Sequence, residues 1–394
     1  MRNWLMIKDY GIRWLNKEEL TESLAHQILY TYHKQLDIEF PSPKTNGRWK
    51  LIAKGWVGSI PLSKDLGIQI IPRVSIHQLY RMLGYAYHLN SLQFHDSLNQ
   101  YETVQQVYEK LAELLAHKIF VRYQKGLSKK YQEKQEKSSI LRGRLNLSKL
   151  VQTPHLVEVP YTYLEQTVDH EDNQILLWTL HQILRFSLCT KETSLREMRK
   201  VYHCLRWGVS LKPYQAKDCS QRVYHPSNKD YQQLHALCRL FLDQMAPVKK
   251  EGGYDAPLFL VYMPRLYELF VTEWIKAHLP SSYQLKAQEQ INIGENNPIR
   301  FRMDIVIYQA GTAKYILDIK YKTNREPSQN DIFQLVSYAY TKGCTEAILV
   351  YPTRQIVPID QWIRKIRVRT LSFPLDGDLT EGGEEFLQQL FETR

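Results

Sequence analysis

Residues 299–323 read IRFRMDIVIYQAGTAKYILDIKYKT and carry the clearest structural pattern in the chain. Two runs rich in β-branched and aromatic residues, 299–309 and 313–323, flank the turn Ala-Gly-Thr at 310–312. This arrangement is typical of a β-hairpin. Side chains alternate along a strand, so one face of the hairpin is expected to be apolar core. That face carries Phe301, Met303, Ile305, Ile307, Tyr315, Leu317, Ile319 and Tyr321.

The other face of this hairpin carries charged side chains that are expected to converge. If Gly311 is the centre of the turn, Asp304 and Asp318 each lie seven residues away and face each other, with Cβ atoms about 5 Å apart. Lys320 lies on the same face as Asp318, and Arg302 on the same face as Asp304. The sequence therefore predicts two carboxylates and a lysine close together on one side of a sheet.

Two carboxylates and a lysine in this arrangement indicate metal-dependent cleavage of phosphodiester bonds. Carboxylates this close repel each other unless a cation lies between them. Mg²⁺, with Mn²⁺ as a substitute, binds one or two carboxylates, keeps several waters and engages phosphate oxygens. Lys320 would position or deprotonate the attacking water and stabilise charge on the phosphate. The alternative is a surface ion pair between Lys320 and either aspartate.

The elements expected on either side of the hairpin supply further candidate residues. A helix before it carries Glu268, a candidate additional ligand of the metal or of its water. A helix after it carries Gln334 and Tyr338, which are four residues apart and therefore lie on one helix face. The expected order is helix 264–278, strands 283–293, 299–309 and 313–323, helix 329–342, strands 346–351 and 362–373, and a final short helix.

The rest of the chain indicates an α+β protein of several domains. Residues 1–75 are expected to form a β-rich domain interrupted by one helix within 17–36. Residues 76–248 are mainly helical, and the turn formers at 249–257 mark the start of a carboxyl-terminal α/β domain, 249–394, with a central mixed sheet. The helices expected in the middle region are 74–89, 101–123, 171–188, 194–207 and 229–245.

The composition indicates which class of partner the protein binds and in which compartment it acts. The 394 residues carry a formal charge of +11 and a pI near 9.2, which favours a polyanion such as nucleic acid, although a basic protein without such a partner is the alternative. The five cysteines form no C-x-x-C pair, so we expect buried free thiols in a reducing compartment rather than zinc or disulfides. Residues 1–10 do not resemble a signal peptide, and no run reaches the ~18 apolar residues of a membrane span. We expect a soluble, cytoplasmic protein without a membrane partner.

Two basic segments leave alternatives open. Residues 125–149 hold eight lysines and arginines and only two acids. They form either a solvated helix face or loop, or a contact with nucleic acid or a partner. Lys365, Arg367 and Arg369 lie on one face of an expected strand and contact either DNA phosphates or solvent. Tyr161 and Tyr163 are expected to pack rather than to stack on bases.

The ordered set of motifs resembles the PD-(D/E)XK nuclease superfamily. Asp304 with Asp318-Ile319-Lys320 matches its two-part motif, with Asp318 where many members have glutamate. The segment from Gln334 to Tyr338 matches the Q-x-x-x-Y element of several branches, in which these residues orient the site and the DNA. The resemblance implies a PD-(D/E)XK core with Asp304, Asp318, Lys320, Gln334 and Tyr338 as catalytic residues and Asp304, Asp318 and Glu268 as metal ligands.

The chain as a whole resembles McrC, the nuclease subunit of McrBC-type modification-dependent restriction systems. The resemblance spans nearly the whole chain and is weakest at 17–42 and about 190–230. The segments that carry it are GWVGSIPL at 55–62, IIPR at 70–73, RMLGYA at 81–86, RGRL at 142–145, DNQIL at 172–176, 262–271, RMDIV at 302–306, LDIKYK at 317–322 and 331–340.

The resemblance implies a DNA endonuclease subunit that docks on a ring of AAA+ GTPase subunits through residues 1–75 and stimulates nucleotide hydrolysis. The partner recognises the modified base and uses GTP or ATP. This chain lacks a G-x-x-x-x-G-K-[ST] loop and is expected to bind no nucleotide alone. Arg142 and Arg144 could approach the partner's nucleotide, but their role stays open. The alternatives are a nuclease that acts alone and a non-catalytic adaptor that stimulates an AAA+ ring.

Overall fold

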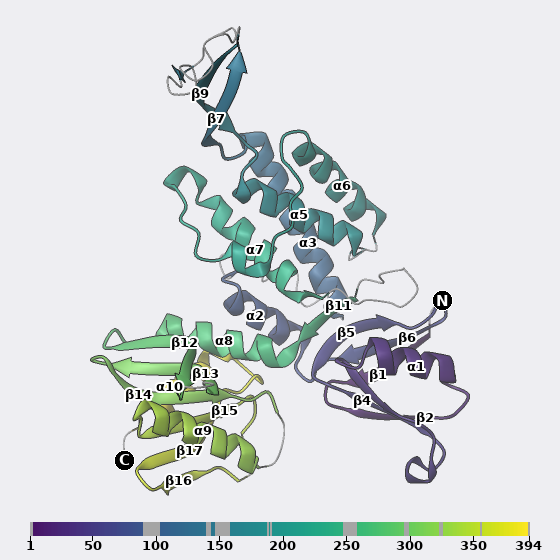
Figure 1. Ribbon diagram of the computed structural model, residues 1–394. Coiled ribbons are helices and arrows are strands. Elements are labelled where there is room, and N and C mark those ends of the chain that lie inside the picture. Colours follow the sequence, from purple (N-terminus) through teal and green to yellow (C-terminus); the bar gives the residue numbers. More distant parts are fainter. Residues whose placement is uncertain are drawn as a thin grey trace. The chain divides into compact units, whose positions relative to one another are not determined.

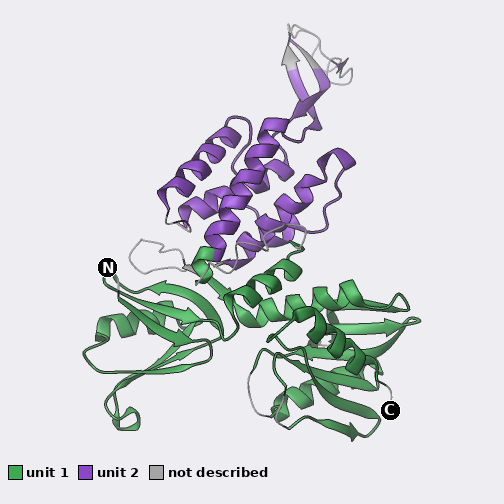
Figure 2. Ribbon diagram, turned by 180° about the vertical axis from the view of Figure 1, so that it is seen from behind, with its two compact units in different colours: residues 1–106, 247–394 green, residues 107–246 purple. Residues whose placement is uncertain are grey.

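The computed structural model describes residues 3–89, 103–138, 143–145, 158–186, 189, 191–246, 258–294, 299–322, 326–354 and 357–392. The chain divides into two compact units: unit 1 is residues 1–106 with 247–394, and unit 2 is residues 107–246 (Figure 1, Figure 2). The segment 249–257 lies outside the described residues. The predicted boundary there and the division into three domains stay predictions.

Unit 1 begins with two small sheets and a helix that share one hydrophobic core. Strands β1, β6, β5 and β11 lie side by side in this order, and β4 lies between β2 and β3. Trp49, Leu51 and Ala53 alternate along β4 and are buried, and Ala25 and Ile28 of α1 enter the same core. This region is β-rich with one helix, as predicted. The bounds are β1 (Asn3–Lys8), β2 (Ile12–Leu15), α1 (Glu22–Thr31), β3 (Leu36–Glu39), β4 (Trp49–Ala53), β5 (Trp56–Pro61) and β6 (Leu66–Ile71).

Strand β11 (Leu258–Tyr262) links the amino-terminal sheet to the rest of unit 1. It pairs antiparallel with β5. Helix α8 (Met263–His278) follows without a loop, and the backbone N–H of Met263 donates to the carbonyl of Gly55 at 2.9 Å. The amino-terminal sheet therefore fixes the start of the helix that carries Glu268.

Helices α2 (Ile76–Ala86) and α10 (Leu379–Phe391) pack beside α8. The close approach of α10 explains a glycine in the middle of that helix. A Cβ atom on Gly383 would lie 2.1 Å from Cζ2 of Trp274, which is fully buried in α8. Any larger residue at this position would therefore push α10 away from α8.

Unit 1 ends in a mixed sheet of six strands in the order β12-β13-β14-β15-β17-β16 (Figure 1). The first three strands are antiparallel, β14, β15 and β17 are parallel, and β16 pairs antiparallel with β17 at one edge. Helix α9 packs Leu335, Tyr338 and Ala339 against Val306 and Ile316 of the sheet. The bounds are β12 (Tyr283–Ile293), β13 (Ile299–Gln309), β14 (Thr312–Ile319), α9 (Gln329–Lys342), β15 (Glu346–Tyr351), β16 (Asp360–Ile363) and β17 (Ile366–Ser372).

Two strands of this sheet differ from the sequence prediction. The single strand predicted at 362–373 is wrong, because the chain turns sharply at Arg364, which has a φ of 56°, and forms β16 and β17 instead. The strand predicted at 313–323 begins one residue earlier and ends at Ile319. Strand pairing sets both limits, and it depends on residues elsewhere in the chain.

The hairpin face that was expected to be charged is charged only at one end. Val306 and Ile316 lie on that face and are fully buried with side chains of α9. On the opposite face Ile305, Ile307 and Leu317 are fully buried, as predicted. Phe301 and Met303 were predicted on that face too, and this is wrong: both lie in the core beside α9, where the ring centroid of Phe301 is 5.2 Å from that of Tyr338. Strands that are covered on both faces are usual in sheets with parallel strands and crossover helices. The charged cluster is therefore confined to the hairpin end that lies away from the turn.

Arg367 and Arg369 of β17 were expected to contact either DNA phosphates or solvent, and both alternatives are wrong. Arg367 is 6% exposed and its Nε is 2.8 Å from Oδ1 of Asp360. Arg369 is 5% exposed and its Nε is 3.1 Å from Oε2 of Glu346. Both guanidinium groups therefore hold the sheet together, and only Lys365 is exposed.

Unit 2 consists of helices with a small sheet that extends away from them (Figure 2). Helix α5 packs against α6 and α7, and Leu176, Leu180, Leu237 and Phe241 are fully buried. Strand β9 lies between β7 and β8. The bounds are α3 (Val104–Lys125), β7 (Lys130–Ser138), β8 (Arg144–Leu145), β9 (Val159–Thr167), α5 (Glu171–Arg185), α6 (Glu192–Arg206), α7 (Asp230–Gln244) and β10 (Met245–Ala246).

Part of the basic segment 125–149 is a strand: Lys130–Ser138 forms β7, paired antiparallel with β9. For these residues the solvated helix face or loop expected from the sequence is wrong. Lys134 makes an ion pair with Glu165 across the strands, and such pairs favour strand pairing over a helix. Arg142 and Lys149 lie outside the described residues.

The tyrosines of β9 pack as predicted. Tyr161 is 4% exposed, and its ring centroid lies 5.6 Å from that of Tyr163. The hydroxyls of both donate to Glu136 of β7, at 3.3 and 3.0 Å. These contacts stabilise the sheet and leave no face of Tyr161 for a base.

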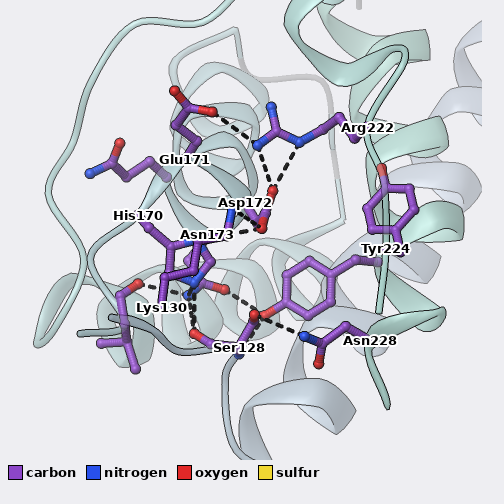
Figure 3. A network of polar contacts seen from close by, with 12 residues as sticks. Ser128, Lys130, His170, Glu171, Asp172, Asn173, Arg222, Tyr224 and Asn228 are labelled. Carbon is purple, nitrogen blue, oxygen red and sulfur yellow. Dashed lines mark hydrogen bonds and ion pairs between the residues drawn. The ribbon is translucent and has the colours of Figure 1, made fainter. Parts of the chain in front are cut away.

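A network of polar side chains holds the first residues of β7 against α5 (Figure 3). Oδ1 of Asp172 is 2.5 Å from Nη2 of Arg222, and its Oδ2 is 2.9 Å from Nζ of Lys130. Nδ2 of Asn173 donates to the carbonyl of Ser128 at 2.9 Å. The network therefore anchors the sheet of unit 2 to its helices.

Two further expectations concern membranes and cysteines. Along the described part of the chain, no helix is long and apolar enough to cross a membrane. All five cysteines are free, and all but Cys204 are buried. The prediction of buried free thiols is thus confirmed for four of the five.

Candidate active site

The hairpin of β13 and β14 sets the register of the site. Gln309 pairs with Thr312, so the turn holds two residues with positive φ rather than the predicted three. Tyr308 pairs with Ala313 but Ile307 pairs with Tyr315, so Lys314 of β14 is an extra residue, and beyond it the register is the predicted one, with Ile305 opposite Leu317. Asp304 and Asp318 are the next residues on the two strands.

The two strands separate at Asp304, and its side chain replaces a backbone contact. Oδ2 of Asp304 accepts a hydrogen bond from the backbone N–H of Ile319 at 2.9 Å. Beyond this point β14 pairs with β15, where the N–H of Lys320 donates to the carbonyl of Val350 at 2.8 Å. The carboxylate of Asp304 is thereby fixed beside the strand that carries Asp318, which is only 4% exposed.

Lys320 lies at the centre of the cluster. Its Nζ is 2.7 Å from Oδ2 of Asp318, and the lysine side chain is 17% exposed. Nζ also donates to Oε1 of Gln334 at 3.3 Å, and Nε2 of Gln334 donates to the hydroxyl of Tyr338 at 2.7 Å. Helix α9 therefore brings both residues of the predicted Gln–Tyr pair to the lysine, although their roles stay predictions.

Glu268 reaches the cluster through another side chain. The amide of Gln288 donates to Oε1 of Glu268 and, at 3.4 Å, to Oδ1 of Asp304. Arg302 donates to the amide oxygen of Gln288. Gln288 has a φ of 54° and interrupts β12 opposite Asp304, which turns its side chain toward the site.

Three residues of this cluster were not singled out for the site from the sequence. Gln288 carries no sequence signal, since glutamine seldom adopts a left-handed backbone. Arg302 was placed on the charged face but given no role. Asp331 is 7% exposed, accepts from Nζ of Lys322 at 2.9 Å and lies 3.6 Å from Nζ of Lys320. A capping signal, Ser328 three residues before Asp331 at the start of α9, could have drawn attention to it.

Burial and mutual repulsion destabilise the charged forms of Asp304 and Asp318 more than the nearby cation stabilises them. Burial, reinforced by the charge of Glu268, raises the pKa of Asp304 to about 6. Burial also raises the pKa of Asp318 to about 6, with Lys320 opposing the change and Asp304 adding to it. Burial lowers the pKa of Lys320, but the neighbouring Asp318 raises it by more. A cation between the two aspartates would stabilise their charged forms.

The cluster fits a metal ion held by two carboxylates rather than three. Within the described ranges no three His, Cys, Asp or Glu side chains lie close enough together to hold an ion. Mg²⁺ requires only one or two carboxylates, with waters and phosphate oxygens completing its shell. Asp304 and Asp318 meet that requirement, and Oδ2 of Asp318 is buried with Lys320 as its ion-pair partner. The role predicted for Glu268 as a ligand stays a prediction, because Gln288 stands between it and Asp304.

Comparisons with known proteins bear on the chain as a whole. The family model described as "McrBC 5-methylcytosine restriction system component" matches residues 51–352. A search of curated proteins gives no match.

Two solved structures from Thermococcus gammatolerans are similar to this chain. One is a refined half-complex from a tetradecameric assembly of McrB AAA+ hexamers with bound McrC; it is 16% identical, has a TM-score of 0.56 and aligns over 99% of this chain and 100% of that chain. The other, a cryo-EM structure of the McrBC complex, is 16% identical with a TM-score of 0.44, over 71% of this chain and 89% of that chain. The first shows a shared mixed α/β fold, and the family match spans most of the sequence. The chain therefore belongs to the McrBC family, and the resemblance to McrC drawn from its motifs is confirmed.

Proposed function

We propose that the chain is a Mg²⁺-dependent DNA endonuclease subunit of a McrBC-type restriction system, with a PD-(D/E)XK core. The observation that carries the proposal is the 2.7 Å contact between Lys320 and Asp318. Beside them, the carboxylate of Asp304 accepts a hydrogen bond from the backbone N–H of Ile319. A lysine between buried carboxylates is unlike the exposed ion pair that was the alternative, because surface pairs are solvated on both partners. The net charge of +11 suits a DNA substrate.

The partner is inferred from the family. McrC of Thermococcus gammatolerans is bound to McrB AAA+ hexamers, and this chain belongs to the same family and shares the fold. The chain therefore acts with an AAA+ GTPase ring, which it stimulates and which recognises modified DNA. The sequence contains no phosphate-binding loop of its own.

The side chains of the cluster divide the work of phosphodiester hydrolysis. Asp304 and Asp318 would hold Mg²⁺, which when bound activates water and neutralises charge on the phosphate. The ammonium of Lys320 donates hydrogen bonds that position the attacking water or stabilise the phosphate oxygen that gains charge. Gln334 holds Nζ of Lys320 at 3.3 Å, and Tyr338 fixes the amide of Gln334. The lysine is thereby held in one orientation before substrate arrives.

Metal dependence gives the first test. Purified chain, its AAA+ partner, GTP or ATP, and modified or unmodified DNA are combined with Mg²⁺, with Mn²⁺, or with EDTA. We expect cleavage of modified DNA in the complete mixture with either ion and none with EDTA, because two buried aspartates need a cation beside them. Gel analysis of DNA ends is the measurement.

The same reactions separate the alternatives. Cleavage by the chain without its partner would support a nuclease that acts alone. Nucleotide hydrolysis stimulated in the mixtures that contain Mg²⁺ or Mn²⁺, with no cleavage in any of them, would support a non-catalytic adaptor and end the endonuclease proposal. Cleavage that persists in EDTA would contradict the metal-dependent mechanism.

Gln334→Ala tests the positioning of Lys320. The variant loses an acceptor for the ammonium and a donor to Tyr338, while the Asp318 contact remains. We expect the cleavage rate to fall by about 10- to 100-fold, the size usual for residues that orient a metal or its ligands. The control is Ser337→Ala on the same helix, where the exposed hydroxyl donates to the carbonyl of Phe333. Equal rates for the two variants would refute the role of Gln334.

A further inference from the structure

A buried carboxylate of the amino-terminal sheet lies behind the candidate active site. Asp9 follows β1 directly and is fully buried. Its N–H donates to the carbonyl of Ile71, so it continues the pairing of β1 with β6. Oδ2 accepts a hydrogen bond from the hydroxyl of Tyr321 at 3.0 Å, and Nε of Arg73 lies 3.3 Å from Oδ1. Nε of Arg73 donates its hydrogen bond to the backbone carbonyl of Asp9 at 2.8 Å, so Tyr321 is the hydrogen-bond donor to the carboxylate and Arg73 is its ion-pair partner.

Tyr321 is the residue directly after Lys320, and its fixed position limits where the lysine can lie. It is 7% exposed and comes after the last residue of β14, where regular strand pairing has ended. Its side chain contacts Asp9 and the ring of Tyr267, whereas that of Lys320 contacts Asp318, so one faces the core and the other the site. The hydroxyl contact with Asp9 therefore holds the backbone at the point where the lysine leaves it.

A second aromatic ring extends this support to α8. The ring centroid of Tyr267 lies 5.8 Å from that of Tyr321, and the Tyr267 hydroxyl donates to the carbonyl of Phe373 at 3.1 Å. Tyr267 is fully buried and directly precedes Glu268. The two rings thus pack together behind the two residues, Lys320 and Glu268, that face the site.

The amino-terminal sheet is connected to Tyr321 directly and to Tyr267 through the start of α8. It contacts Tyr321 through Asp9 and starts α8 through β11, where the N–H of Met263 donates to the carbonyl of Gly55. The geometry points to Asp9 as a positioning residue of the site: its carboxylate holds Tyr321, and thereby Lys320, in register with the amino-terminal sheet. This inference rests on the proposed nuclease function. If Asp9 has this role, the amino-terminal sheet helps to position Lys320.

The test measures kcat and KM for DNA cleavage in the complete complex with Mg²⁺, for wild type, Tyr321→Phe, Asp9→Asn, Asp9→Ala and the double variant Asp9→Ala/Tyr321→Phe. Tyr321→Phe keeps the ring and loses only the hydrogen bond to Asp9. We expect kcat to fall about 10-fold with KM within about twofold, since a displaced lysine slows chemistry but not DNA binding.

Two comparisons separate positioning from simple loss of stability. Asp9→Asn keeps an oxygen that can accept from Tyr321, so its kcat should lie between those of wild type and Asp9→Ala. The double variant should be no slower than the slower single variant, because both substitutions remove the same hydrogen bond between Tyr321 and Asp9. Melting temperatures and stimulation of the partner's nucleotide hydrolysis are measured alongside, and stimulation should stay at the wild-type level.

The matched control is Tyr308→Phe. Tyr308 lies in the same sheet and its hydroxyl donates to Oε2 of Glu289 at 2.7 Å, with Nζ of Lys342 at 2.9 Å. This phenol, carboxylate and cation reproduce the chemistry of the Asp9 cluster away from Lys320, so the variant should cleave at the wild-type rate.

Each outcome decides one claim. An unchanged kcat in Tyr321→Phe, or an equal loss in Tyr308→Phe, would overturn the role of Asp9 while leaving the nuclease intact. If Tyr321→Phe unfolds, Asp9→Asn decides, and a rate no better than that of Asp9→Ala overturns the inference. Absence of cleavage by the wild-type complex would instead overturn the proposed function.

Discussion

Lys320→Ala and Asp318→Ala are each expected to reduce DNA cleavage by about 10³-fold or more, while partner binding and stimulation of nucleotide hydrolysis stay near the wild-type level. Removing Lys320 takes away the cation that lies 2.7 Å from Asp318 and the group proposed to stabilise charge on the phosphate. Single donors of this kind are worth about 10²- to 10³-fold in rate. Removing Asp318 takes away one of the two carboxylates proposed for the metal, which affects water activation as well.

Cleavage assays and nucleotide hydrolysis assays on the same protein preparations check this expectation. Lys342→Ala is the matched control, because Nζ of Lys342 lies 2.8 Å from Glu289 and its side chain is 16% exposed, against 2.7 Å and 17% for Lys320. The control removes a lysine of similar exposure, from α9, whose ion-pair partner Glu289 of β12 is more exposed than Asp318, at 20% against 5%. A comparable loss in Lys342→Ala would mean that damage to the fold explains both results. Loss of hydrolysis stimulation together with cleavage would contradict the division of labour between this chain and its ring.

Local periodicity predicted much of the carboxyl-terminal fold. The expected strands 283–293 and 299–309 and the expected helix 329–342 coincide with β12, β13 and α9. Each is long and has a regular repeat of apolar residues in the sequence, so neighbouring residues alone specify its type. The errors lie where pairing with distant residues decides the structure. The alternating charges of 125–149 fit a solvated helix as well as a strand until β9 lies beside them.

The candidate site was predictable to the extent that strand and helix geometry determine it. Alternation put Asp318 and Lys320 together, and a four-residue spacing put Gln334 and Tyr338 on one face. The positive φ of Gln288 could not be foreseen, and it keeps Glu268 from joining the aspartates directly. The contact of Tyr321 with Asp9 was equally invisible, because 312 residues separate them in the sequence.

Asp172→Ala should destabilise unit 2 by about 3 kcal/mol. Its carboxylate is 14% exposed and contacts Arg222 at 2.5 Å and Lys130 at 2.9 Å (Figure 3). Removing one member of a buried ion pair typically costs about 3–5 kcal/mol, since the cations lose their counter-charge. The lower figure applies because Arg222 keeps Glu171 at 3.1 Å. At about 2–4 °C per kcal/mol, the melting transition of this unit should fall by roughly 6–12 °C.

Thermal unfolding followed by far-ultraviolet circular dichroism measures this change on the full chain. Asp230→Ala is the control, since Asp230 pairs with Arg122 at 3.1 Å but is 45% exposed, so its loss should cost below about 1 kcal/mol. Burial raises the pKa of Asp172, but hydrogen bonds from Lys130 and Arg222 lower it by more, and the net pKa lies below the usual 3.8. The stabilising contribution of the carboxylate is therefore complete at pH values well above 3.8 and is lost as the pH falls through the pKa of the folded state. Wild type and Asp172→Ala should accordingly converge in melting temperature toward low pH, and a gap that stayed constant with pH would show that lost packing, not the charge network, accounts for the difference.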